Sequence, residues 1–348
     1  MSRPRKSAAG LACLFALAIA GCSAGSGGTG GGEAGGGTAD SAPSATSDPS
    51  GGAGTSSTAY APYVSATTAS ALDAAGSPAT YNLAFVISDG GDCTPRWNGS
   101  HALDDSSVAS RIEQLTDDGA TVRVSFGGAS GKELAAVCGS ARALAEAYGE
   151  ALDAAGGATL ADFDIEGDEL TDSASVALRS EAIALLQAER EDLDVTFTLP
   201  VMPAGLDDDG IALLESANDH GVQVSTVNLM TMNYGESYGG DMGDYALTSA
   251  EAAHTQLRKV FGSSAAAAWR GMALTSMLGV NDVAGETFTL ADAAEVRAFA
   301  EEKEIAWVSM WSTFRDRSCG GDSGADDAAT DCSGVTQEDG AFGEAFAG

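Results

Sequence analysis

Basic side chains and histidines are scarce in this sequence. Its 348 residues include 17 lysines and arginines, 50 aspartates and glutamates and three histidines, which gives a formal charge of −33. Such an acidic surface cannot neutralise phosphates, so it argues against binding to nucleic acid. The histidines are scattered and no Cys-x-x-Cys spacing occurs, so we expect no zinc site. The charge is compatible with an outward-facing protein, including one in a salty environment.

Several common motifs are also missing. No Gly-x-Gly-x-x-Gly follows the first predicted strand, and Gly131-Lys132 lacks the remaining residues of a phosphate-binding loop. No Gly-x-Ser-x-Gly nucleophile turn occurs. The sequence therefore does not favour a nucleotide-binding protein or a serine hydrolase.

The N-terminal residues resemble a targeting segment. Three basic residues precede the apolar run Leu11–Ala20, which is too short to span a bilayer but has the layout of a secretory signal peptide. Ile19-Ala20-Gly21-Cys22 resembles the bacterial lipobox, although a chance cysteine beside an ordinary cleavage site is the alternative. We expect residues 1–21 to be removed and lipid on Cys22 to be the only attachment to a membrane.

A tether follows the predicted lipid anchor. Residues 22–58 are almost entirely Gly, Ser, Thr, Ala and Asp, without an aromatic residue, so they should be disordered. A Gly-rich coil of this length would hold the folded part roughly 30–35 Å from its anchor. We expect residues 59–348 to form a monomeric, extracytoplasmic domain, attached to the cell membrane or released into the medium.

Four cysteines remain after the signal peptide and the lipidated cysteine are set aside. An exported protein favours disulfides, and four cysteines allow three pairings. We favour the pairs Cys93–Cys138 and Cys319–Cys332, the second of which closes a short loop near the C-terminus.

Short apolar runs alternate with amphipathic stretches beyond the tether. The expected strands are 60–65, 81–88, 121–128, 161–167, 194–201, 224–234, 271–280 and 306–312. The expected helices are 134–152, 175–187, 206–220, 248–261 and 291–300, the last capped by Thr289. Eight strands separated by helices predict a single-domain α/β fold, a (β/α)8 TIM barrel, and a doubly wound open sheet is the alternative. In a barrel, chemistry belongs at the C-terminal ends of the strands.

Three carboxylates are spaced two residues apart in Ala161–Gly167. Asp162, Asp164, Glu166 and Gly167 match the opening of a calcium loop, but the twelfth position of that loop would be Ser173 rather than Glu. As a strand, the segment instead turns all three acids to one face, which points into a barrel. Neighbouring negative charges raise one another's pKa, so we expect one acid to stay protonated, as a general acid requires.

This acidic strand resembles the Asp-x-Asp-x-Glu core of glycoside hydrolase family 18, the chitinases and endo-β-N-acetylglucosaminidases. Three further motifs of that family occur in the same order: Ser125-Phe126-Gly127-Gly128, Met232-Asn233-Tyr234 and Met310-Trp311-Ser312. The sequence departs from the family pattern at Thr159-Leu160, where the family has Asp-Gly, and at Gly235, where it often has Asp. Together the motifs span residues 60 to about 315.

The resemblance implies a substrate-assisted, retaining mechanism without a metal or organic cofactor. Glu166 would protonate the leaving oxygen, and the substrate's own acetamido oxygen would attack the anomeric carbon. Asp164 would orient the acetamide N–H, and Asp162 would share a proton with Asp164. Tyr234 would hold the acetamido oxygen, and Trp311 would form the floor under the sugar. Tyr234 and Trp311 have packing roles as alternatives.

Further substrate contacts are expected around these residues. By the resemblance, Ser125, Gly127 and Gly128 line the site or serve close packing, and Met232 lies at the end of the sixth strand. Asn281 and Asp282 lie at the end of the seventh strand, on the expected catalytic face.

Two further features concern the shape of the expected groove. Trp97 is expected to stack on a sugar at the rim or to cover the loop of Cys93. Only about 25 residues separate the seventh and eighth strands, so we expect no inserted domain and an open groove.

The resemblance predicts hydrolysis of a polysaccharide or oligosaccharide that contains β-1,4-linked N-acetylglucosamine, such as chitin. N-glycans or peptidoglycan-like chains are alternative substrates, because they carry the same acetamido group. A sugar-binding barrel lipoprotein without turnover is a further alternative, which the intact Glu166 disfavours.

Overall fold

The computed structural model describes residues 58–320 and 331–348. The predicted signal peptide, Cys22 and the tether as far as residue 57 lie outside these ranges. Within the described ranges, no helix is both long and apolar enough to cross a membrane.

The strands of the main sheet follow the predicted alternation. The parallel strands are β1 (Ala59–Tyr60), β2 (Tyr63–Ser65), β3 (Thr80–Ser88), β5 (Thr121–Gly127), β6 (Leu160–Asp164), β7 (Asp194–Pro200), β8 (Val224–Met230), β9 (Met272–Met277) and β12 (Trp307–Trp311). The order in the sheet is β1-β12-β9-β8-β7-β6-β5-β3-β2, and β4 (Pro95–Trp97) pairs antiparallel with β3.

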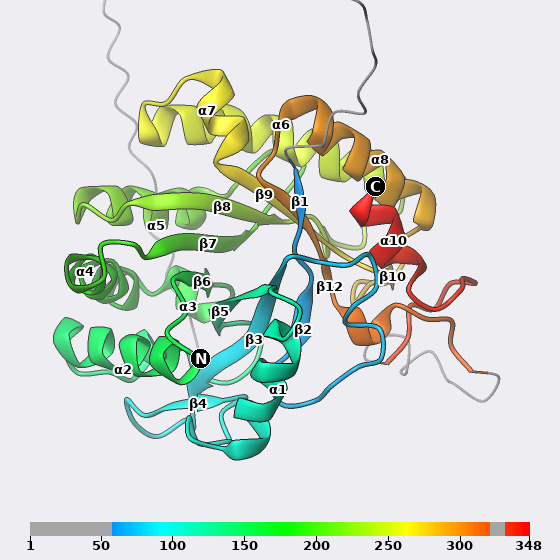
Figure 1. Ribbon diagram of the computed structural model, residues 1–348. Coiled ribbons are helices and arrows are strands. Elements are labelled where there is room, and N and C mark those ends of the chain that lie inside the picture. The colour runs from blue at the N-terminus through cyan, green and yellow to red at the C-terminus, as the bar shows by residue number, and fades with distance from the viewer. Residues whose placement is uncertain (1–57, 321–330) are drawn as a thin grey trace, which may run out of the picture. The chain divides into compact units, whose positions relative to one another are not determined.

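The barrel closes because β1 and β2 are two halves of one strand with different partners. The Ala61 N–H donates to the Val308 carbonyl at 3.0 Å, and the Pro62 carbonyl accepts from the Asn82 N–H at 2.9 Å. Pro62 has no N–H, so the strand changes its partner where a donor is missing. β1 pairs with β12 and β2 with β3, which confirms the predicted eight-stranded barrel (Figure 1).

Helices surround this sheet on its outer face (Figure 1). They are α1 (Ser106–Thr116), α2 (Ala141–Ala154), α3 (Asp168–Thr171), α4 (Ser173–Glu189), α5 (Asp208–Asp219), α6 (Met242–Phe261), α7 (Ala265–Arg270), α8 (Leu290–Lys303) and α10 (Ala341–Ala347), with 3-10 turns η1 (Leu134–Ala136) and η2 (Thr313–Arg315). Thr289 caps α8 through a capping box with Asp292, as predicted. Asp105 caps α1, whose buried face is Val108, Ile112 and Leu115; this helix was not predicted.

Strand alternation separates an apolar outer layer from a polar barrel interior. Phe163 on β6 points outward and packs on Tyr148 of α2, with ring centroids 5.0 Å apart. The ring centroids of Phe126 and Phe197, on the neighbouring strands, lie 5.2 and 5.8 Å from the centroid of the Phe163 ring. The other face of β6 carries Asp162, which is fully buried inside the barrel. The strand interpretation of this acidic segment is therefore confirmed.

Several predicted boundaries were wrong. β6 ends at Asp164 and β8 at Met230, three and four residues earlier than expected. The helix expected over 134–152 is divided into η1 and α2, because Ser140 starts α2 as its N-cap. α6 begins at Met242 behind an Asp241 cap, six residues before the expected start.

Both predicted disulfides are present. Cys93–Cys138 joins the loop between β3 and β4 to the segment before α2, and Cys319–Cys332 spans 13 positions near the C-terminus. Between β9 and β12 the chain forms the hairpin β10 (Gly279–Val280) and β11 (Thr287–Phe288), followed by α8. The barrel therefore carries no inserted domain between its last two strands, as expected.

Candidate active site

A cavity of about 310 Å³ opens at the C-terminal ends of the barrel strands. Asp164 and Glu166 come from β6 and the turn after it, Met232 from the loop after β8, and Asp282 from the loop between β10 and β11. Trp311 at the end of β12 also lines it. Five of the predicted site residues thus meet in one cavity, at the face that the barrel fold predicts.

Asp162 lies below the cavity and is held by three hydroxyl groups. Its Oδ2 accepts from the Tyr63 hydroxyl at 2.8 Å and from Ser125 Oγ at 2.5 Å, and its Oδ1 accepts from Thr198 Oγ1 at 2.7 Å. Burial raises the pKa of Asp162 above its usual value, and these donors and the nearby Arg123 guanidinium offset only part of the rise. Three donors and a cation favour the anion, so Asp162 is the member of the acidic strand best able to stay charged.

Asp164 has a different environment two residues further along the strand. Its Oδ1 is buried and has no hydrogen-bond partner among the described residues. Burial, together with the charges of Glu166 and Asp162, raises the pKa of Asp164 well above its usual value. A proton shared within the acidic strand should therefore reside on Asp164, where it can donate to an incoming acceptor.

Glu166 lies beyond the end of β6, at the cavity wall. Burial, followed by the charges of Glu169 and Asp282, raises the pKa of Glu166 to about 7. A carboxyl group with a pKa near neutrality can donate a proton in one step and accept it in the next. Lys132 pairs with Glu169 at 3.8 Å and partly offsets its charge.

Aromatic rings frame the floor of the cavity around Trp311. The Phe85 ring stacks against Trp311 with centroids 5.5 Å apart, and Tyr63 meets it edge-on at 5.8 Å. Phe314 contacts Trp311 edge-on at 6.2 Å from the other side. An indole fixed in this way offers a flat apolar surface beside the two carboxyl groups.

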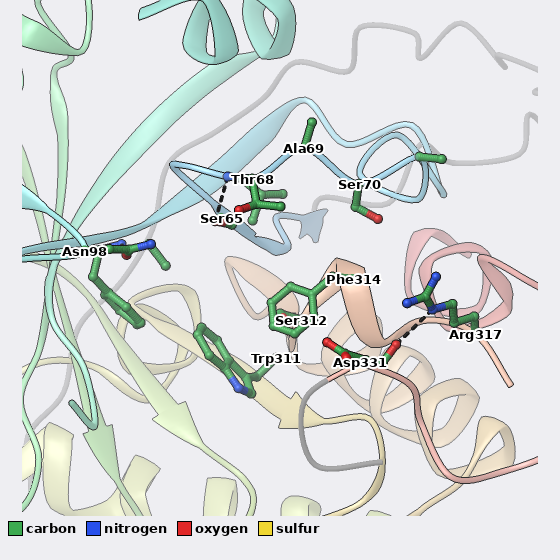
Figure 2. A pocket seen from close by; sticks show the side chains of 14 residues that line it. Ser65, Thr68, Ala69, Ser70, Asn98, Trp311, Ser312, Phe314, Arg317 and Asp331 are labelled. Atoms are coloured by element: carbon green, nitrogen blue, oxygen red, sulfur yellow. Dashed lines mark hydrogen bonds between the residues drawn. The ribbon is translucent and has the colours of Figure 1, made fainter. Parts of the chain in front are cut away.

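A second cavity of about 570 Å³ shares Phe85 and Trp311 with the first (Figure 2). Its other lining residues include Ser65, Thr68, Asn98, Phe314, Arg317 and Asp331. Figure 2 shows Trp311 and Phe314 on one side of this space and the Ser65–Ser70 loop on the other. We refer to these two cavities, which share Phe85 and Trp311 in their walls, as the groove.

The wall of the first cavity also contains the turn after β8. Met230, Met232 and Asn233 line it, and Asn233 Nδ2 donates to Asp282 Oδ2 at 3.4 Å. Asn233 has a left-handed backbone with φ of 54°, a conformation that asparagine tolerates better than most residues. This residue was not predicted as a site residue.

Tyr234 does not line the cavity, and its contact with substrate stays a prediction. Its side chain is 3% exposed, and its hydroxyl accepts from Ser249 Oγ on α6 at 3.5 Å. Its ring packs on Tyr238 and Tyr245. The physical reason is the early end of β8, because beyond Met230 the chain turns and no longer alternates about a strand axis.

Ser125, Gly127 and Gly128 support the site without lining it. Ser125 is fully buried and donates to Asp162. A Cβ on Gly127 would lie 2.1 Å from the Asp164 carbonyl oxygen, and one on Gly128 would lie 2.8 Å from the Phe85 ring. The close contacts favour the packing alternative for both glycines, and none of the three residues lines the cavity.

Asn281 and Trp97 are also corrected. Asn281 is buried, and its amide donates to the Met277 and Gly279 carbonyls at 3.0 Å each, so it stabilises the start of the hairpin. Trp97 is fully buried on β4, where it pairs with Val86 of β3, so it cannot stack on a sugar.

The residues that sequence reasoning missed follow the same alternation as the acids. Thr198 on β7 is in register with Asp164 on β6, and Tyr63 follows Pro62 on the first strand. Polar residues at every second position of β7, Thr196 and Thr198, were the available signal for inward-facing groups.

Among residues 58–320 and 331–348, one cluster of three carboxylates outside the cavity has the spacing that a metal ion would need. Asp241, Asp244 and Glu295 have ligand atoms within 4.8 Å of one another, and all three are exposed. Exposed acidic clusters are common without an ion, and these residues do not line the cavity.

No family model matches the sequence, but the chain is similar to curated proteins. The chain is 34% identical over 284 residues to a probable bifunctional chitinase/lysozyme of Escherichia coli, covering 77% of this chain and 31% of the relative. It is 34% identical over 249 residues to endochitinase 11 of Metarhizium anisopliae, covering 68% and 47%. The chain thus spans about a third to a half of the length of these curated relatives.

A solved structure extends this likeness to the fold. The catalytic domain of a hyperthermophilic chitinase from Pyrococcus furiosus superimposes with a TM-score of 0.72 at 29% identity, covering 83% of this chain and 94% of that domain. Catalytic-site mutants of active domain 2 of the chitinase from that organism, complexed with chito-oligosaccharides, match with the same TM-score and identity.

Proposed function

We propose, on the premise that this chain belongs to the chitinase type of glycoside hydrolase family 18, that it hydrolyses β-1,4-linked N-acetylglucosamine chains. The proposal rests on the place and the pKa of Glu166. Its carboxyl group lines one cavity together with Asp164 and Trp311, and its pKa is about 7. A proton donor, a buried neutral carboxyl group and an aromatic floor are the parts that substrate-assisted cleavage needs.

In the proposed reaction Glu166 gives its proton to the leaving glycosidic oxygen. The substrate's acetamido oxygen attacks the anomeric carbon and forms a cyclic oxazolinium, whose positive charge Asp164 stabilises after its proton has passed toward Asp162. The Glu166 carboxylate then takes a proton from water, which opens the ring and returns the anomeric configuration to its starting form.

The groove offers places for the rest of a sugar chain. One sugar would rest on Trp311, and further sugars would occupy the second cavity beside Asn98 and Phe314. Asn233 and Asp282, which line the wall where Tyr234 was expected, would contact polar groups of the sugar. No inserted domain deepens the groove between β9 and β12, which supports non-processive cleavage.

The test is release of reducing ends from colloidal chitin and from the N-acetylglucosamine tetramer. Wild type and a Glu236→Gln control, changed at an exposed carboxylate outside the cavity, should cleave both, and Glu166→Gln should bind the tetramer without cleaving it. Tetramer binding by an inactive wild type would support the sugar-binding lipoprotein instead.

The same enzyme variants should also be tested on the alternative substrates. One relative's name includes lysozyme, so peptidoglycan is a second candidate substrate. Cleavage of a high-mannose glycopeptide but not of chitin oligomers would move the activity to the endo-β-N-acetylglucosaminidases.

We also propose that the protein acts outside the cytoplasm, held at the membrane by lipid on Cys22. The support is the signal-like segment and lipobox-like Ile19-Ala20-Gly21-Cys22, together with two disulfides in the barrel. Mass spectrometry of the mature N-terminus should find a diacylglyceryl cysteine, and Cys22→Ala should abolish detergent-phase partitioning. An unmodified Cys22 would contradict the anchor.

A further inference from the structure

A buried carboxylate outside the cavity holds the turn that forms part of the cavity wall. Glu286 lies in the loop just before β11 and is 1% exposed. Its Oε1 accepts from the Gly235 N–H at 2.8 Å, while its Oε2 is buried and has no hydrogen-bond partner among the described residues. Burial raises the pKa of Glu286, and the backbone N–H groups of Gly235, Asn233 and Tyr234 partly offset this rise. The Gly235 N–H therefore links this buried side chain to the turn, and the two preceding N–H groups lie close enough to favour its charged form.

The contact with Glu286 accompanies an unusual backbone in the turn after β8. Asn233 has φ of 54° and Gly235 has φ of 114°, and alternation of this kind turns successive N–H groups toward one side. Without the Glu286 carboxyl group, the Gly235 N–H would lose this acceptor. The turn and the carboxylate therefore stabilise each other.

The same two segments meet again at the cavity. Asn233 Nδ2 donates to Asp282 Oδ2 at 3.4 Å, and Asp282 belongs to the same hairpin loop as Glu286. Both Asn233 and Asp282 line the cavity beside Glu166. The hairpin loop thus holds the turn from behind through Glu286 and contacts it on the cavity side through Asp282.

We propose that Glu286 is a positioning residue for the proposed hydrolase site: it fixes the turn after β8, and so holds Asn233 and Asp282 at the cavity wall. We call the link between Glu286 and the turn after β8 the clamp. The kinetic consequences of the clamp rest on the proposed function, but the presence of the clamp does not. Asp282 held in place keeps a negative charge near Glu166. The charged groups that face Glu166 are Asp164 on β6, Glu169 on α3 with its partner Lys132, and Asp282 on the hairpin loop.

The first readout needs no ligand. In Glu286→Gln the carboxamide keeps one acceptor oxygen but places an N–H₂ group against the remaining backbone N–H groups. Hydrogen exchange of the peptide that covers residues 231–235 should become faster than in wild type. The matched control is Asp292→Asn, which also removes a buried carboxylate that accepts a backbone N–H, from Thr289 at 2.6 Å, but at the start of α8. It should leave exchange at residues 231–235 unchanged.

The second readout is kinetic, at a temperature well below the unfolding midpoint of every variant. Glu286→Ala should lower kcat/KM for the N-acetylglucosamine tetramer by about 10- to 100-fold, since small displacements of positioned groups have effects of this size. Glu286→Gln should lower it less. The alkaline limb of the Glu286→Gln pH profile should move to lower pH, in the same direction as in Asp282→Asn. Asp292→Asn should change neither property.

The outcomes separate the clamp from the hydrolase. If wild type does not cleave any substrate, the proposed function fails, but faster exchange at 231–235 in Glu286→Gln still supports the clamp. If wild type cleaves and Glu286→Gln keeps both the wild-type exchange and the wild-type alkaline limb, the inference is overturned. Lower kcat/KM without any change in exchange or in the pH profile would also overturn it, because it would show general destabilisation.

Discussion

At the scale of single residues, hydrogen-bond donors distinguish two carboxyl groups that share one strand face. Asp162 accepts from three hydroxyl groups, while Asp164 Oδ1 accepts from none among the described residues. Burial raises the pKa of both, but donors offset the effect only at Asp162. The same physical rule applies to Glu166, whose neighbours Glu169 and Asp282 add negative charge and no donor.

The alkaline limit of activity should follow the charges around Glu166. Glu166 must be protonated to act as an acid, so activity should fall as the pH rises through about 7. Glu169→Gln removes a negative charge, lowers the pKa of Glu166 and should move this limb to lower pH. Lys132→Met leaves Glu169 without its partner and should move the limb to higher pH. The pH dependence of kcat/KM measures both shifts, and equal shifts in one direction would refute this explanation.

The raised pKa of Glu166 should also cost stability above neutral pH. Its folded-state pKa of about 7 exceeds the unfolded value of about 4.3, so its contribution is favourable at low pH and is lost as the pH rises through 7. At pH 8 Glu166→Gln should therefore be more stable than wild type by about 1–3 kcal/mol, with the difference disappearing near pH 4. Urea unfolding at the two pH values measures this. A variant less stable than wild type at pH 8 would contradict the assignment.

The positions of the acids could be predicted from sequence, while that of Tyr234 could not. Within β6, period-two alternation places Asp162 and Asp164 on one face regardless of what surrounds the strand. Met232 and Tyr234 lie beyond the end of β8, where a left-handed Asn233 breaks the alternation and turns Tyr234 toward α6. A motif gives the order of residues but not the directions of side chains after the strand ends.

At the scale of elements, the ends of neighbouring strands are fixed by a close backbone contact. Gly127 ends β5 with φ of 98°, and the Gly128 N–H donates to the Asp164 carbonyl at 2.9 Å. This approach aligns the end of β5 with the end of β6, and so sets the height of Asp164 in the barrel. The strands could be predicted from alternation, but the hairpin with Glu286 could not, because β10 and β11 have two residues each.

Gly127→Ala should disturb both stability and the site. Its Cβ would lie 2.1 Å from the Asp164 carbonyl oxygen, in addition to the cost of a left-handed alanine. The loss should be about 3 kcal/mol or more, with reduced kcat/KM in the folded fraction. Gly119→Ala is the matched control, because its φ is 86° but nothing lies within 4 Å, so it should lose only about 1–2 kcal/mol. Equal losses in urea unfolding would show that the close contact does not matter.

At the scale of the whole molecule, the balance of charge dominates behaviour in solution. With a formal charge of −33, carboxylates repel one another across the surface more than lysines and arginines can offset. The net charge was not needed to predict the fold, because the alternation of strands and helices already indicates a barrel. The charge governs instead how the folded state responds to salt.

Salt should stabilise the folded protein at neutral pH. Raising NaCl from about 0.05 to about 1 M shortens the screening length to about 3 Å, which weakens repulsion in the folded state. The unfolding temperature should rise by several degrees at pH 7. It should rise less at about pH 4, where many carboxylates are protonated. Calorimetric scans at the two pH values measure this, and a Tm that falls with salt at pH 7 would contradict it.

In the proposed reaction Glu166 and the substrate's own acetamido group cleave the chain together, with the anomeric configuration retained. The most direct measurement is proton NMR of the N-acetylglucosamine tetramer during the first moments of hydrolysis, before the anomers of the product equilibrate. The new reducing end should appear first as the β-anomer, and the fully deacetylated tetramer should not be cleaved. A new reducing end that appears first as the α-anomer, or equal cleavage of the deacetylated tetramer, would contradict the proposed reaction.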